Sequence, residues 1–189
     1  RYQRFSESGT YELTVGASSR LDLAKKVISS IVSDSDLIRG ANFGLTTWSS
    51  SASVHTCISR NGAAEIKAGI GSITAGGGTS LGVAMGVAQN TIDSGCWPYV
   101  SAQCEVGGVM TDLQKNFMIV ISDGVWSGHD SAKSIVTTLS DSYGVKSFVI
   151  GFMLGSDSGH TNYDELANAG DPGRTPPAVP MFAENWEEL

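Results

Sequence analysis

The stretch "NFMIVISDG", residues 116–124, is almost continuously apolar from Phe117 to Ile121 and then ends on Ser-Asp-Gly. Such a run predicts a strand buried on both faces, as in a parallel sheet covered by helices. Residues 130–144 follow with apolar side chains at helical spacing, and "KSFVIGFML", residues 146–154, predicts a second buried strand that runs parallel to the first and lies next to it. The alternation predicts an α/β fold, a doubly wound and mostly parallel sheet with helices on both faces.

The flanking sequence extends the same alternation in both directions. Apolar spacing predicts helices before and after the central strand, and alternating or apolar runs predict shorter strands. The expected helices cover residues 20–33, 63–73, 80–93 and 163–170, and the expected strands cover residues 42–50, 53–59 and 180–185.

Length, composition and charge limit the classes of function. The 189 residues fit one domain, and their net charge of −7 argues against nucleic acid as a partner. The sequence contains no apolar run of about 18 residues, the length that predicts a membrane-spanning helix.

Cysteine spacing predicts a disulfide instead of a zinc site. Cys96 and Cys104 flank a short loop, whereas Cys57 lies in an expected strand. We expect a Cys96–Cys104 bond, with two free thiols as the alternative, and a bond here implies an oxidising compartment. Cys57 then remains either as a buried strand residue or as a partner for a group outside the chain.

A glycine cluster, residues 76–78, precedes Thr79 at the start of an expected helix. No lysine follows it, so the pattern does not match a phosphate-binding loop. Asp123 ends the central strand, and loops at the carboxyl edge of such a sheet form ligand sites. Thr79 and Asp123 offer oxygen ligands suited to Mg²⁺, Mn²⁺ or Ca²⁺. The alternative is that Thr79 only caps a helix and Asp123 only forms a turn.

Four stretches carry a family resemblance: "SRLDLAKKVISSIV", "ITAGGGTSLGVAM", "FMIVISDG" and "ELANAG…PMFAENWEEL". Together, from Arg20 to Leu189, they resemble a von Willebrand factor A domain. The resemblance implies a metal-ion-dependent adhesion site, in which the threonine of the Gly-Gly-Thr loop matches Thr79. The aspartate of the family's Thr/Ser-Asp-Gly loop matches Asp123.

One motif of that family, Asp-x-Ser-x-Ser after the first strand, is absent from the sequence. Either residues 11–19, "YELTVGASS", form a degenerate first strand with Ser18 and Ser19 in the ligand loop, or the strand lies upstream of Arg1. We favour the second explanation, because residues 11–15 alternate as a half-exposed strand does. The chain is then a single domain, 1–189, with insertions at 1–19 and 95–115 and an incomplete metal site.

The positions of these insertions and the ending are similar to the A domains of the PilC/PilY family. That resemblance implies a non-enzymatic, extracellular or cell-surface domain that acts in type IV pilus assembly, surface sensing and adhesion. The implied partners are a host or surface ligand or the pilus subunits.

Two other functions remain as alternatives. One is an intracellular A domain that couples to an ATPase, as in chelatase-type complexes. The other is a metal-dependent hydrolase, which needs a general base near Asp123, and the sequence offers no candidate.

Overall fold

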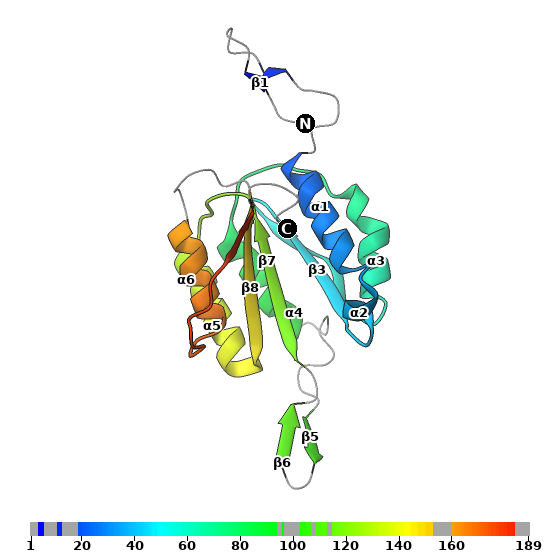
Figure 1. The fold of residues 1–189 in the computed structure, drawn as a ribbon, viewed down its shortest axis with the longest axis vertical. Helices are drawn as coiled ribbons and strands as arrows, with labels where there is room; N and C mark the ends of the chain where they lie inside the picture. The colour runs from blue at the N-terminus through cyan, green and yellow to red at the C-terminus, as the bar shows by residue number, and fades with distance from the viewer. Residues whose placement is uncertain are drawn as a thin grey trace.

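A computed structural model describes residues 4–5, 11–12, 19–93, 96, 103–106, 109–112, 115–152 and 160–183. Strands and helices alternate through most of this range (Figure 1). The main elements are α1 (Arg20–Ile31), α2 (Ser35–Ile38), β3 (Phe43–Trp48), β4 (Ala52–Ser59), α3 (Gly62–Gly69), the 3-10 helix η1 (Ile70–Ser72), α4 (Leu81–Asp93), β7 (Asn116–Ser122), α5 (His129–Tyr143), β8 (Val145–Phe152), α6 (His160–Gly170) and β9 (Met181–Ala183).

Strands β7, β8 and β9 form a parallel block in that order. Val120 lies opposite Val149 in the β7–β8 pair, and Ile150 lies opposite Met181 in the β8–β9 pair. The predicted neighbouring parallel strands are therefore confirmed. The short edge strand predicted near the end of the sequence is also confirmed, as β9.

Helices α4, α5 and α6 cover one face of this block. Val120 and Val149 point into a core that also contains Leu81, Val136 and Leu166, and each of these side chains is buried. The α/β fold predicted from the sequence is confirmed by this layered arrangement.

The opposite face of β7 and β8 is open in the part of the chain that the structure describes. Phe117, Ile119 and Phe148 are 59%, 45% and 46% exposed, and the rings of Phe117 and Phe148 lie 5.7 Å apart. The prediction that Phe117–Ile121 is buried on both faces was therefore wrong. An apolar run shows that one face enters the core, but it does not show that a helix covers the other.

Strands β3 and β4 form a separate antiparallel block. Phe43 and Leu45 pack against a cluster that includes Val32, just after α1, and Ile66 of α3. Trp48 packs instead against the core that contains α4. Helices therefore lie on both faces of this block, as the sequence predicts.

Helix α4 contacts both β3 and β4, and its Leu81 belongs to the same buried core as Val120 of β7. In the described residues, β3 is not hydrogen-bonded to β7. The two blocks are thus joined by helix packing and, as shown below, by hydrogen bonds between loops.

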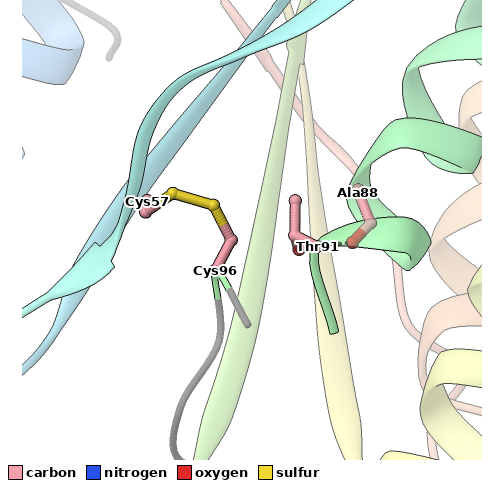
Figure 2. The surroundings of a disulfide bond; sticks show 4 residues. All are labelled: Cys57, Ala88, Thr91 and Cys96. Atoms are coloured by element: carbon pink, nitrogen blue, oxygen red, sulfur yellow. Dashed lines mark hydrogen bonds between the residues drawn. A yellow bond between two sulfur atoms is a disulfide. The ribbon is translucent and has the colours of Figure 1, made fainter. Parts of the chain in front are cut away.

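The disulfide joins Cys57 to Cys96, so the predicted Cys96–Cys104 pairing was wrong (Figure 2). Both expectations for Cys57 were also wrong, because this exposed residue of β4 pairs within the chain. The physical reason is the course of the chain: α4 packs beside β4, so Cys96, shortly after its end, lies next to that strand. A backbone hydrogen bond of 3.0 Å from Ile58 N–H to the Cys96 carbonyl strengthens the link.

Short antiparallel hairpins lie in the two expected insertions. The first pairs β1 (Arg4–Phe5) with β2 (Tyr11–Glu12), and the second pairs β5 (Gln103–Val106) with β6 (Val109–Asp112). The other residues of 1–18, most of 95–115 and all of 184–189 lie outside the described residues. None of the described helices has the length and apolarity needed to cross a membrane.

Candidate metal-binding site at the sheet edge

The glycine loop before α4 lies against the turn that follows β3. Gly77 has a φ of +80°, and a Cβ there would lie 2.9 Å from Ser50 Oγ and 3.1 Å from Ser49 Oγ. Gly78 N–H donates a hydrogen bond of 2.6 Å to Ser50 Oγ. The glycine cluster therefore permits a close approach between two loops, in a conformation that L side chains adopt only with strain.

Thr79 links this loop to the turn after β7. Its carbonyl accepts a 2.8 Å hydrogen bond from Ser127 N–H, and Ser127 in turn accepts one of 3.2 Å from Leu81 N–H. Ser80 N–H donates to the Ser49 carbonyl at 2.8 Å. The turns that follow β3 and β7 thus meet on residues 79–81, as expected for loops at the carboxyl edge of a parallel sheet.

Asp123 follows directly after β7, and its carboxylate is 41% exposed. Arg20, the first residue of α1, donates from Nη1 to the Asp123 carbonyl at 3.0 Å. The same nitrogen lies 3.6 Å from Asp123 Oδ2. Asp123 therefore already faces a positively charged group.

Tyr163 of α6 is hydrogen-bonded to the turn that contains Asp123. Its hydroxyl donates a 2.9 Å hydrogen bond to the Gly124 carbonyl, and its residue is fully buried. Burial raises the pKa of Tyr163 above its ordinary value of 10.0. The hydroxyl consequently stays protonated and able to donate at neutral pH.

The structure brings the loops of Thr79 and Asp123 together through Ser127. The recorded contacts of the Asp123 carboxylate are with Arg20. A metal ion shared by Thr79 and Asp123 stays a prediction.

The donor chemistry of this edge fits a hard cation in part. The Thr79 hydroxyl accepts no hydrogen bond and donates none within the described range, so its oxygen is available. The Arg20 guanidinium beside Asp123 marks the position where a positive charge is stabilised. Among the described residues, no three His, Cys, Asp or Glu side chains form a metal-ligating group. Two protein ligands leave most of the coordination shell of Mg²⁺ to other oxygens.

A second polar cluster follows the Asp123 turn in the sequence and extends to α6. Trp126 is buried and donates from Nε1 to His129 Nδ1 at 3.2 Å, while His129 Nε2 lies 3.0 Å from Glu165 Oε2. Since Nδ1 accepts, Nε2 carries the proton and donates to Glu165. Both ring nitrogens of His129 are therefore engaged, which leaves neither free to act as a general base.

Lys133 completes the cluster with a 2.6 Å ion pair to Glu165 Oε2. The Lys133 ammonium and the His129 hydrogen bond lower the pKa of Glu165 below its ordinary value of 4.5. Glu165 in turn raises the pKa of Lys133. This cluster links α6 to α5 near the sheet edge.

Sequence reasoning missed Arg20, Ser50 and Ser127 at this edge. The sequence did contain a feature that indicates Ser50, because a serine-rich turn follows a strand that ends at the same edge as β7. Arg20 carried no such signal, since 103 residues separate it from Asp123.

Comparison with known proteins places these observations in a family. The family model for the von Willebrand factor type A domain matches residues 16–189. No curated protein sequence matches the chain.

One solved structure shares the fold at low sequence identity, and a second resembles this chain only weakly. The manganese-loaded TRAP protein of Plasmodium vivax is 17% identical with a TM-score of 0.57, over 87% of this chain and 61% of that one. An uncharacterised membrane-spanning protein of Vibrio fischeri is 15% identical over 100% of this chain and 86% of that one, with a TM-score of 0.36. The second score is too low to bear on the fold. The family match covers most of the sequence, and the chain belongs to the von Willebrand factor type A domain family.

Proposed function

We propose that this domain binds a protein partner through a divalent cation held by Thr79 and Asp123. The threonine hydroxyl and the aspartate carboxylate supply hard oxygen ligands, suited to Mg²⁺, Mn²⁺ or Ca²⁺. Waters and other oxygen ligands complete the coordination shell. A bound cation supplies a positive charge that an acidic group of a partner can ligate.

The observation that carries this proposal is the 2.8 Å hydrogen bond between Ser127 N–H and the Thr79 carbonyl. It ties the glycine loop to the turn that begins at Asp123, so both ligand loops lie at one edge. The family match adds support, as does the manganese bound to the TRAP protein, whose fold this chain shares.

The proposed location is the cell surface. The Cys57–Cys96 disulfide supports it, because such bonds persist mainly in oxidising compartments. The finer proposal, a role in type IV pilus assembly, surface sensing and adhesion, rests on the similarity to PilC/PilY A domains. Immunogold labelling of piliated cells that produce the protein tests it, and label confined to the cytoplasm would contradict it.

The same disulfide weighs against an intracellular domain that couples to an ATPase. The engaged ring nitrogens of His129 weigh against a hydrolase, because this histidine near the Asp123 turn is committed to Trp126 and Glu165. These contacts favour a binding domain over an enzyme.

Calorimetric titration of the full chain with MnCl₂ and MgCl₂ tests the proposal. We expect Asp123→Ala to lose at least tenfold in affinity, since it removes the only charged ligand proposed, and Thr79→Ala to lose less. Asp141→Ala is the matched control, because Asp141 is exposed near the far end of α5. Equal binding by the wild type and Asp123→Ala would overturn the proposed site.

A further inference from the structure

We infer that Arg20 lowers the cation affinity of this site by competing with the cation for Asp123. The inference rests on the proposed function, because it assigns a role to Arg20 at the same carboxylate. It concerns a residue of α1 that lies far from both ligand loops in the sequence.

The contact geometry places the guanidinium directly on Asp123. Arg20 Nη1 is 3.0 Å from the Asp123 carbonyl oxygen and 3.6 Å from Oδ2. A single nitrogen therefore contacts both the backbone and the side chain of the same residue. The two side chains are 54% and 41% exposed, so a cation can reach this carboxylate from solvent.

Local structure holds Arg20 at this position. Ser19 and Asp22 form a capping box, in which Ser19 Oγ accepts from Asp22 N–H at 3.1 Å and Asp22 Oδ2 accepts from Ser19 N–H at 3.0 Å. The start of α1 is thereby fixed, with Arg20 as its first residue. The Asp22 carboxylate is hydrogen-bonded to Ser19. The acidic side chain that Arg20 contacts is that of Asp123.

The first turn of a helix is an unfavourable place for a positive charge, because the helix dipole is positive there. Asp123 therefore supplies a negative charge that stabilises the Arg20 guanidinium, whereas the N-terminus of α1 does not. A divalent cation bound to the same carboxylate would meet both the guanidinium and the positive helix end. Cation binding is therefore weaker while Arg20 stays beside Asp123, and the apparent affinity is lower the larger the fraction of molecules in which Arg20 holds this position.

Titration of the full chain with MnCl₂ alone tests this inference through binding, with no activity involved. Exposed ion pairs of this kind change equilibrium constants by up to about fivefold. We expect Arg20→Gln to bind Mn²⁺ about two- to fivefold more tightly than the wild type, and Arg20→Lys to remain close to the wild type. The gain should shrink as salt rises, because salt screens exposed charges.

Arg39→Gln is the charge-matched control, since Arg39 is exposed after α2 and its loss should leave Mn²⁺ affinity unchanged. Circular dichroism melts check that the variants fold. Equal affinity of the wild type and Arg20→Gln, with binding intact, would overturn the role of Arg20 and leave the site standing. No Mn²⁺ binding by any variant would overturn the proposed function and this inference with it.

Discussion

Ser127 N–H donates a 2.8 Å hydrogen bond to the carbonyl of Thr79, 48 residues earlier in the chain. A parallel bridge between Ser80 and Ser127 continues this contact. The edge at which the candidate ligands lie is therefore formed by backbone bonds. Backbone hydrogen bonds persist when side chains are substituted. Substitutions at Thr79 or Asp123 should therefore change cation binding without separating the two loops.

The glycine loop offers a test of this edge by stability. Gly77→Ala should destabilise the domain by about 1–2 kcal/mol, because L residues are strained at positive φ. The new Cβ would also displace Ser50 Oγ from Gly78 N–H. Urea unfolding measures the effect. The control is Gly76→Ala, where an added Cβ meets nothing within 4 Å, and equal losses for both variants would contradict the described loop.

The disulfide predicts a specific peptide pattern. Non-reducing peptide mapping of protein purified without reductant should recover Cys57 linked to Cys96, and Cys57→Ala should lower the free energy of unfolding by about 2–4 kcal/mol. The disulfide stabilises the fold because it closes a loop across a sequence separation of 39 residues. A Cys96–Cys104 peptide in folded material would refute this connectivity.

Adjacent residues of β7 should lose very different amounts of stability when a charge is introduced. Val120 is 3% exposed and Ile119 is 45% exposed. Val120→Asp should cost roughly 3–5 kcal/mol or unfold the domain, because an unpaired charge enters the core. Ile119→Asp should cost far less, because its carboxylate can reach solvent. Thermal melts of the two variants decide, and similar losses would mean that both faces of β7 are covered.

The cluster at Glu165 predicts a pH dependence. A carboxyl group whose pKa falls on folding stabilises the fold above its unfolded pKa and loses that effect as pH falls through its folded pKa. The stability difference between the wild type and Glu165→Gln should therefore be constant near neutral pH. It should shrink as pH falls below about 4.5, the ordinary pKa of this group.

Urea unfolding from neutral pH to pH 3 measures this difference. In a Lys133→Gln background the pKa of Glu165 should lie closer to its ordinary value, since the ammonium is the largest cause of its shift. A difference that grows as the solution becomes more acidic would contradict the assignment.

The sequence predicted the order of elements because apolar spacing reports which residues enter a core. It identified β7 and β8 as parallel neighbours, yet it did not reveal that Phe117 and Phe148 are exposed. Exposure depends on which elements cover the second face, and no local pattern records that.

Contacts between distant segments were beyond the sequence for the same reason. Cys57 pairs with Cys96 because α4 ends beside β4, and three cysteines in a sequence do not reveal that geometry. Thr79 and Asp123 could be placed at one edge by the topological rule for parallel sheets. The contact between Arg20 and Asp123 could not, because it depends on where α1 begins relative to β7.

Paramagnetic broadening by Mn²⁺ tests the central claim most directly. In amide NMR spectra of the full chain, substoichiometric Mn²⁺ should broaden the signals of Thr79, Gly124 and Ser127 first. The signal of Val145 should stay sharp, because this residue begins β8 at the opposite edge of the sheet. Broadening centred on Asp34 and Asp36 at the start of α2, or none at Thr79 and Gly124, would contradict a cation site at this edge.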